Sequence, residues 1–424
     1  MTEKEIALNA IRKKLIGKNL TYKEIFAIMD EISKNKMSDV LITYFAASGF
    51  STGFTDDEIY YLTRAMVETG EKLKFRGIVA DKHSIGGVPG TRTSLIIVPI
   101  VAAAGFKIPK SSSRAITTPG GTADDMEILA PVTLTRRKIY SVVKKTNGCI
   151  VWGGSFNIAP ADDIIIKVEE SLRFESYDKI LVSIMAKKVA FGSTHVVIDL
   201  PYGKYVKVHR LSDAKVLKRK FEKLAERFNI KIEVLIHKTD EPAGNGIGPA
   251  LEVIEALKVL ERQETRSLDL EARSINLAGS LIELCLSDSP KTLQDSIRKN
   301  YKNGYNWAQN ILDEGLALSK MKEIIKAQGG NPAITSDKIK PGKYTFTYKS
   351  PKKTEIINII ISNLTSVTKI LGAPDHKGAG IYLHKKIGDE IVKGDKICTF
   401  YADSMYNLRE GKESLANFPL FEFK

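Results

Sequence analysis

The pattern of apolar and polar positions changes twice along the chain. Over residues 1 to about 75, apolar side chains recur at helical spacing, as in LTYKEIFAIMDEISKNKMSDVLITYF, and Thr55 followed by acidic residues is typical of a helix start. From about residue 77, short strand-like runs such as RGIVADKHS and FKIPKSSSR alternate with glycine-rich turns and helices. Strands that alternate with helices predict a parallel sheet.

After about residue 340 the pattern becomes that of short strands, in GKYTFTYKS, TEIINIIISN and GAGIYLHKKIGDEIVKGDKICTFYAD, with tight turns at GDE and GDK. We therefore expect an α/β fold with two flanking domains. The expected parts are a small all-helical domain at 1–75, to which residues around 155–190 return, an α/β domain at 76–340, and a C-terminal β-rich α+β domain at 341–424.

Composition narrows the class of protein. The apolar content of 43% is that of a globular protein, and no segment approaches the ~20 apolar residues of a membrane span. The first residues lack the apolar core of a secretory signal, and three widely spaced cysteines, Cys149, Cys285 and Cys398, argue against disulfides or a zinc knuckle. We expect a cytoplasmic protein with no membrane partner. The net charge of +14 is spread over short, scattered basic runs, none of them interleaved with aromatic residues in the way that binders of single strands need, so no nucleic acid polymer is expected.

One glycine-rich turn has the features of an anion site. A predicted strand ends in Lys82, His83 and Ser84, and a helix begins near Thr93 and Ser94 after the sequence IGGVPGTR. Such a turn directs backbone N–H groups and a helix N-terminus at one point, which suits phosphate. The turn matches neither G-x-x-x-x-G-K-[ST] nor G-x-G-x-x-G. The alternative is a purely structural turn in which Ser94 caps the helix.

A second turn of the same kind favours the binding interpretation. The stretch SSSRAITTPGGTADDMEIL has hydroxyl groups and an arginine at a predicted strand end, then two glycines and a helix that opens at Thr122. Its acidic residues Asp124, Asp125 and Glu127 fit the first turn of that helix, where carboxylates complement the macrodipole. We therefore expect no metal site there.

Seven ordered motifs give the chain a family resemblance. They are DKHSIGGVPG, SSSRAITTPGGTADDMEIL, GGSFNIAPADDIIIKVE, SIMAKK, GNGIGPALEVIEAL, LAGSLIELC and AQGGNP. With these motifs the chain resembles the thymidine/pyrimidine nucleoside phosphorylase family, and more closely its archaeal-type branch, the AMP phosphorylases. The resemblance implies a nucleoside phosphorylase/phosphoribosyltransferase-like architecture and a pentosyltransferase that splits nucleoside 5′-monophosphates (AMP, also CMP and UMP) with inorganic phosphate. The products would be free base and ribose 1,5-bisphosphate.

The resemblance also implies roles for particular residues. The inorganic phosphate cradle would comprise Lys82, Ser84, Ser94, Ser112 and Thr122. The substrate-binding positions would be Gly87, Ser113, Arg114, Ala115, Ile116, Thr117, Thr118, Thr122, Ser183, Lys187 and Lys207. His83 and Arg114 would face the sugar or the base and act in catalysis. For the motif that holds Ser183 and Lys187, the alternative is one ordinary helical face with the serine inside and the lysine outside.

The proton donor is where the chain departs from the family pattern. The family has an aspartate at this position, and the alignment of VEESLRFESYDKILVSIMAKK places Glu175 there, eight residues before Ser183. A glutamate can act as a general acid if burial raises its pKa. Asp178, three residues further on, is the alternative donor.

Other functions stay open at this stage. The leading alternative is a pyrimidine nucleoside (thymidine or uridine) phosphorylase that gives a (deoxy)ribose 1-phosphate and ignores the 5′-phosphate. Arg92 and Lys207 are cations that such an enzyme would not need. A phosphoribosyltransferase and a non-catalytic nucleotide-binding protein are further alternatives. We expect no cofactor, with phosphate as co-substrate, a structural C-terminal domain, and a homodimer or higher homo-oligomer.

Overall fold

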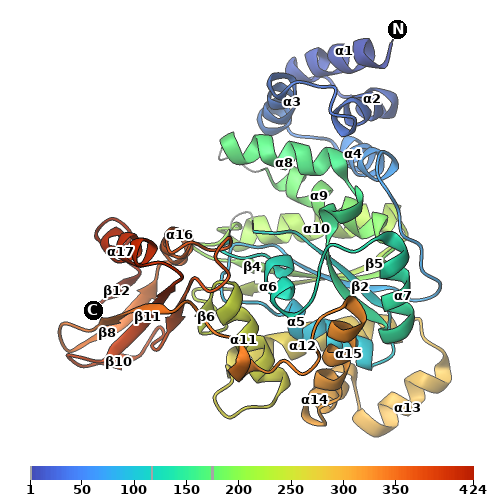
Figure 1. The fold of residues 1–424 in the computed structure, drawn as a ribbon. Coiled ribbons are helices and arrows are strands. Elements are labelled where there is room, and N and C mark those ends of the chain that lie inside the picture. Colours follow the sequence, from blue (N-terminus) through green and yellow to red (C-terminus); the bar gives the residue numbers. More distant parts are fainter. Residues whose placement is uncertain (1, 116–117, 173–175) are drawn as a thin grey trace.

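The computed structural model describes residues 2–115, 118–172 and 176–424. The chain forms three parts, which Figure 1 shows as a helical bundle above a central α/β domain, with a β-rich domain at its side. This is the expected fold class. Within the described residues, no helix combines the length and the apolarity needed to cross a bilayer.

The helical domain is built from α1 (Glu3–Leu15), α2 (Tyr22–Ser33), α3 (Asp39–Thr52) and α4 (Asp56–Glu68), joined by the returning helices α8 (Pro160–Leu172) and α9 (Tyr177–Ala190). The predicted cap at Thr55 is confirmed, because its side chain accepts a hydrogen bond from the backbone of Glu58. Lys14 and Glu58 form a buried ion pair at 2.9 Å. Helices α2 and α3 contact α8, and α4 contacts α9, so two distant parts of the chain share one core.

The predicted parallel sheet is confirmed. Strands β1 (Ala80–Ser84), β4 (His195–Tyr202) and β5 (Lys231–Lys238) pair in the order β1-β4-β5, and β2 (Ile108–Ser112) pairs with β3 (Gly148–Trp152), all in parallel. A bridge between Val79 and Lys107 joins the two groups. Because the strands are parallel, Ser84 and Ser112 both lie at the carboxyl edge, where ligands bind in such sheets.

The central domain also contains nine described helices. They are α5 (Ser94–Ala103), α6 (Thr122–Leu129), α7 (Arg136–Thr146), α10 (Leu211–Arg227), α11 (Pro249–Leu260), α12 (Leu268–Leu286), α13 (Lys291–Tyr301), α14 (Gly304–Asp313) and α15 (Leu316–Gln328), with short 3-10 turns at Gly153–Phe156 and Ser336–Lys338. Helices α5, α6, α7, α10, α12 and α15 contact the strands of the sheet, whereas α11, α13 and α14 pack on other helices. Helix α5 is buried from Ser94 to Ala102 and packs against α12 and α15. It is therefore an internal helix whose N-terminus has a fixed position.

The C-terminal domain is an antiparallel β structure with two helices. Its elements are β7 (Tyr344–Lys349), β8 (Thr354–Ile359), α16 (Ile361–Ile370), β9 (Gly380–Leu383), β10 (Glu390–Ile391), β11 (Lys396–Ala402), α17 (Met405–Glu413), a 3-10 turn at Ser414–Ala416 and β12 (Phe421–Phe423). One correction concerns TEIINIIISN, which we expected to be a strand throughout. The strand ends at Ile359, and the last residues begin α16, because Ile361, Leu364 and Val367 are buried at helical spacing.

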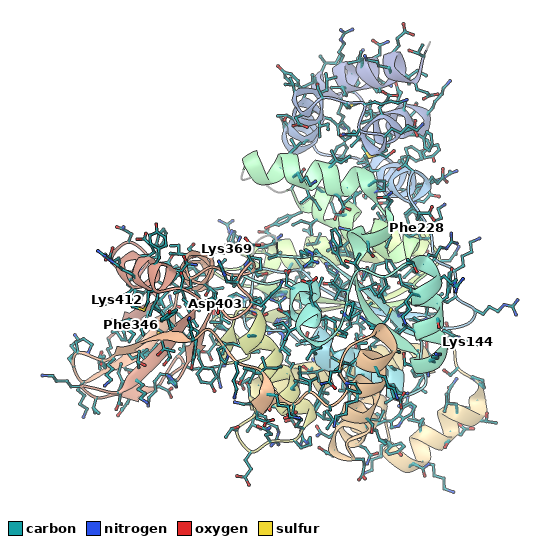
Figure 2. All side chains as sticks on the ribbon, viewed as in Figure 1. Lys144, Phe228, Phe346, Lys369, Asp403 and Lys412 are labelled. Carbon is teal, nitrogen blue, oxygen red and sulfur yellow. The ribbon has the colours of Figure 1, made fainter. Side chains whose placement is uncertain are left out.

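The C-terminal domain is joined to the central domain by strand pairing. The short strand β6 (Gly246–Ile247) of the central domain pairs with β9, so that the sheet runs in the order β6-β9-β11-β7. Gly248 has a φ of +102°, and a Cβ there would lie 2.4 Å from the carbonyl oxygen of Ala379. Lys386 donates to the carbonyl of Pro242 at 2.8 Å. These contacts determine which side of the C-terminal domain faces the central domain. Figure 2 shows Lys369 on that side of the C-terminal domain.

Candidate active site

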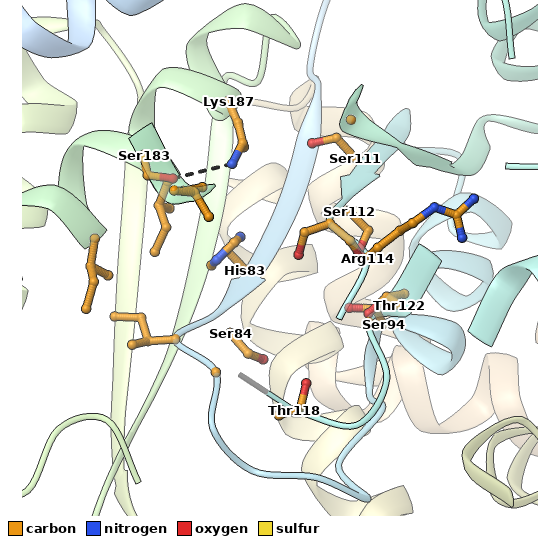
Figure 3. Close-up of a pocket in the computed structure, with 18 of the residues that line it drawn as sticks. His83, Ser84, Ser94, Ser111, Ser112, Arg114, Thr118, Thr122, Ser183 and Lys187 are labelled. Carbon is orange, nitrogen blue, oxygen red and sulfur yellow. Dashed lines mark hydrogen bonds between the residues drawn. The ribbon is translucent and has the colours of Figure 1, made fainter. Parts of the chain in front are cut away.

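A cavity of about 800 Å³ opens where the three parts of the chain meet. Its walls are the carboxyl ends of β1 and β2 with the turns that follow them, the inner sides of α8 and α9, and one lysine of α16. Figure 3 shows Ser183 and Lys187 of α9 on one side of the site and Ser112, Ser94 and Thr122 on the other, with His83 between them in this view.

The first glycine-rich turn holds a buried lysine at its centre. Lys82 is 2% exposed, and its ammonium group donates to the hydroxyls of Ser84 and of Thr93, the latter at 2.7 Å. Burial lowers the pKa of Lys82 to about 8. Gly87 and Gly90 have φ angles of +99° and +70°, which side chains disfavour. Ser94 is the first helical residue rather than the cap, since Thr93 occupies the N-cap position.

The second turn is closed by a carboxylate. Helix α6 begins at Thr122, as predicted, and Oδ2 of Asp124 accepts hydrogen bonds from the backbone N–H groups of Gly121 at 2.9 Å and Ala115 at 2.7 Å. A Cβ on Gly121 would lie 2.5 Å from the carbonyl oxygen of Ser113. The carboxylate of Asp124, in the first turn of α6, therefore shapes the second glycine-rich turn as well as capping the helix. Among the described residues, no group of acidic, histidine and cysteine side chains is arranged to hold a metal.

The predicted phosphate cradle is gathered in one place. All five side chains line the cavity: Lys82, Ser84, Ser94, Ser112 and Thr122. Sequence reasoning missed a second buried lysine beside them. Lys110 is 4% exposed, donates to the carbonyl of Ser111, and has a pKa lowered to about 7 by burial and by the nearby Lys188. The stretch PKSSS, in which this lysine precedes the hydroxyl groups on the same strand, was the available signal.

His83 lies in the cavity as a neutral imidazole. Burial, followed by the charges of Lys188, Lys110 and Lys187, holds its pKa well below the usual value. Lys188, which also lines the cavity, is paired with Asp81 at 2.6 Å. A neutral ring can donate a hydrogen bond from one nitrogen and accept one at the other.

Helix α9 supplies the opposite wall. Ser183 and Lys187 both line the cavity, so the alternative in which the lysine points outward is wrong. Asp162 of α8 holds both residues, since it accepts from Ser183 at 2.8 Å and pairs with Lys187 at 2.6 Å. Burial works to lower the pKa of Lys187, but Asp162 and Asp163 outweigh it and raise the pKa.

The guanidinium group of Arg114 forms ion pairs with two acidic residues of α6. It pairs with both carboxylate oxygens of Glu127 at 2.7 Å and with Asp124 at 3.1 Å, and it lies 5.2 Å from the ring centre of Trp152. Figure 3 shows the group directed away from His83. Arg114 is nevertheless one of the cavity-lining residues, and its catalytic role stays a prediction.

Arg92 corrects an expectation from the sequence. We expected a spare cation for the 5′-phosphate, but its Nε lies 2.5 Å from Glu252 and 2.8 Å from Asp125, and Nη2 donates to the carbonyl of Gly120 at 2.8 Å. Glu252 also accepts from the backbone N–H of Gly90 at 2.7 Å. The charge of Arg92 therefore joins the two glycine-rich turns. Below, residues 85–92 are called the first anion turn and residues 113–121 the second anion turn, after the ligand predicted for them.

The remaining predicted binding residues divide into three groups. Those that line the cavity are Gly87, Ser113, Thr118 and Lys207. Ala115 is not among the lining residues, and its backbone is held by Asp124. Ile116, Thr117 and Glu175 lie outside the described residues.

The alternative proton donor, Asp178, faces away from the cavity. It pairs with Lys220 and accepts from the backbone of Phe54 at 3.3 Å, and it is not a lining residue. A carboxylate that the sequence reasoning did not single out does line the cavity. Asp163 of α8 has a pKa raised by burial, and its signal was the paired acids in APADD.

Asp199 of β4 is a further lining carboxylate that was missed, as were Asp162 and Glu169 of α8. It is 2% exposed, accepts from Ser84 at 2.7 Å and lies 3.2 Å from Nη2 of Arg273. Burial works to raise the pKa of Asp199, but Arg273 and Lys82 outweigh it and lower the pKa. The carboxylate thus orients the Ser84 hydroxyl from below.

Comparison with known proteins identifies the family. Residues 8–70 match the helical bundle domain of a glycosyl transferase family, residues 76–318 its a/b domain, and residues 356–417 the pyrimidine nucleoside phosphorylase C-terminal domain. The AMP phosphorylase of Thermofilum pendens is 44% identical over 96% of this chain and 76% of its own length. That of Methanospirillum hungatei is 43% identical over 97% and 78%. The chain belongs to the AMP phosphorylase family.

Another family member, from Methanocaldococcus jannaschii, is 44% identical over 96% of the chain and 78% of its own length. Among solved structures, anthranilate phosphoribosyltransferase from Thermus thermophilus superposes with a TM-score of 0.61 at 17% identity, over 75% of this chain and 99% of that one. At this identity the likeness concerns the fold. The family resemblance and the architecture expected from the sequence motifs are both confirmed.

Proposed function

We propose that this member of the AMP phosphorylase family is a pentosyltransferase that splits nucleoside 5′-monophosphates with inorganic phosphate. The substrates are AMP and also CMP and UMP, and the products are free base and ribose 1,5-bisphosphate. The observation that carries the proposal is the 44% identity to an AMP phosphorylase over 96% of the chain. The relatives' names do not favour the alternative of a nucleoside phosphorylase.

The cavity suits the bond changes of this reaction. A phosphate oxygen forms a bond to C1′ while the C1′–N bond to the base breaks, the electron pair passes to the base, and a proton follows it. Positive charge develops on the sugar, so the enzyme must hold the phosphate dianion beside C1′. We assign this task to Lys82 and the hydroxyls of Ser84, Ser94, Ser112 and Thr122, which line one cavity.

The departing base requires a proton donor. We propose Glu175 for this role, from its position in the motif before Ser183. Asp163 is the second candidate, because it lines the cavity and burial raises its pKa, which favours the protonated form of a carboxyl group. The neutral His83 and Arg114 are proposed to contact the sugar or base.

The same proposal includes the co-substrate, the cofactor requirement, the compartment and the assembly of the protein. Inorganic phosphate is a co-substrate, no cofactor is required, and the protein works in the cytoplasm as a homodimer or higher homo-oligomer. The three cysteines are free and buried, and burial raises the pKa of Cys149 to about 12, so these thiols are poorly reactive.

A release assay tests the function directly. The protein is incubated with AMP, CMP, UMP, adenosine, uridine and thymidine, each with and without phosphate, and the free base is quantified. We expect phosphate-dependent release from the monophosphates. No release from any substrate would contradict the phosphorylase function, and release from nucleosides alone would establish the alternative.

A further inference from the structure

A lysine of the C-terminal domain lines the substrate cavity. Lys369 lies in the last turn of α16, on the side of that domain that faces the central domain (Figure 2), and it is exposed. It is nevertheless one of the cavity-lining residues, together with Gly87 of the first anion turn and Lys207 of the loop after β4. The C-terminal domain is therefore part of the substrate site as well as a flanking structure.

The helix that carries Lys369 is fastened to the cavity rim. Its first residue, Ile361, is buried in a small apolar cluster with Val88 of the first anion turn and Val206 of the loop after β4. Next to this cluster, the side-chain amide of Asn358 donates to the hydroxyl of Tyr205 at 3.2 Å. Together with the pairing of β6 and β9, these contacts hold α16 at a defined place beside the cavity.

The same rim carries the other residues expected to contact the nucleotide. Lys207 directly follows Val206, and a Cβ on Gly87 would lie 3.4 Å from Cγ of Lys207. The rim thus brings together Gly87 and two lysines from different domains. Arg92, which the sequence offered for this purpose, is engaged by Glu252 and Asp125.

We propose that Lys369 binds the 5′-phosphate of the nucleotide and so makes the C-terminal domain a determinant of selectivity for nucleotides over nucleosides. This inference rests on the function proposed above. A phosphate monoester carries about −1.5 to −2 charges at pH 7 and accepts several charge-assisted hydrogen bonds. A lysine on a fixed helix supplies one such contact as a point charge, in addition to the contact expected from Lys207.

The test compares Lys369→Ala with Lys369→Arg and with a matched control. The control is Lys412→Ala, which removes an exposed lysine from α17 of the same domain, where its ammonium lies 5.2 Å from the ring of Phe346 and outside the cavity lining. The measurements are the KM values for AMP and inorganic phosphate, the inhibition constants of ribose 5-phosphate and adenine, and kcat.

Loss of one charge-assisted contact should raise the KM for AMP and the inhibition constant of ribose 5-phosphate about 10-fold in Lys369→Ala. The KM for phosphate, the inhibition constant of adenine and kcat should stay within about twofold, because only the 5′-phosphate loses a partner. Lys369→Arg should keep most of the affinity for AMP. An equal rise in both KM values, or an AMP response no larger than that of Lys412→Ala, would overturn the inference.

Failure of the proposed function gives a different result. In that case the unaltered protein would release no base from AMP, whatever residue stands at position 369. Calorimetric titration with ribose 5-phosphate then tests Lys369 without turnover: weaker binding to Lys369→Ala than to Lys412→Ala supports the inference, and equal binding overturns it.

Discussion

Nε of Arg92 lies 2.5 Å from a carboxylate oxygen of Glu252, which is 160 residues further along the chain. The same guanidinium reaches Asp125 and the carbonyl of Gly120, so one side chain connects the first anion turn, the second anion turn and α11. Burial raises the pKa of Asp125, and Arg92 opposes that rise. The spacing between the two turns depends on this connection.

Arg92→Met should therefore affect both stability and phosphate binding. It leaves two buried carboxylates without their cation, which costs about 3–5 kcal/mol of unfolding free energy. Arg92→Met combined with Asp125→Asn and Glu252→Gln removes the buried charges and should recover most of that loss, while the KM for phosphate stays raised because the turns are no longer joined. Thermal unfolding and steady-state kinetics measure the two effects. A triple variant with the normal KM would show that the connection does not position the turns.

Three carboxylates are compared here as the donor of the proton to the departing base. Glu175→Gln should lower kcat by ~10²–10⁴-fold if Glu175 is the general acid. Asp163→Asn is the competing variant, because Asp163 lines the cavity and has a raised pKa. Asp178→Asn serves as the comparison and should stay within about threefold, since Asp178 pairs with Lys220 away from the cavity. The largest loss in kcat at pH 7 identifies the donor, and a larger loss in Asp178→Asn than in the other two would contradict this assignment.

Phosphate binding should weaken above pH 8. The pKa of Lys82 is lowered by burial to about 8, so its ammonium is charged below this pH and loses its proton as the pH rises through it. The measurement is the dissociation constant of inorganic phosphate at pH 7.5 to 9.5, above the pKa of about 7 of the neighbouring Lys110. The dependence should flatten in Lys82→Met, which has no proton to lose. A constant affinity across this range in the unaltered protein would contradict the role of Lys82.

The junction between the domains is sensitive at Gly248. Gly248→Ala places a methyl group 2.4 Å from the carbonyl oxygen of Ala379 at a φ of +102°, which should cost more than the roughly 1–2 kcal/mol of backbone strain alone. Gly388→Ala is the matched control, because its φ is +88° and no atom lies within 4 Å of the added carbon. We expect a larger fall in melting temperature for Gly248→Ala and a raised KM for AMP in that variant only. Equal effects would show that the close packing at this junction has little importance.

Much of the architecture was readable from local patterns. The strand β1, the cap at Thr55 and the helix start at Thr122 each depend on a few neighbouring residues, so they can be read from the sequence. The parallel pairing was inferred from the alternation of strands with helices. The end of β8 was misread, because a run of isoleucines suits a strand and a buried helix equally well.

Which charged residues form ion pairs could not be predicted from local sequence patterns. Arg92 looked like a free cation because its partners, Asp125 and Glu252, are distant in sequence and meet it only in the fold. Lys110, Asp163 and Asp199 were missed for a related reason, since a buried charged residue looks like a surface residue until its neighbours are known. The helical position of Lys369 gave no hint that α16 would reach the cavity.

The pairing of β6 with β9 has a kinetic consequence. It joins the domain that holds Lys369 to the domain that holds Lys82, and so it connects the two cavity walls that we propose to bind the two phosphate groups of the product. Ribose 1,5-bisphosphate carries a phosphate for each wall, whereas the free base carries none. After the bond to the base has broken, the sugar product still has both of its anchors. The base should therefore leave first, and departure of the bisphosphate should set the pace of each turnover.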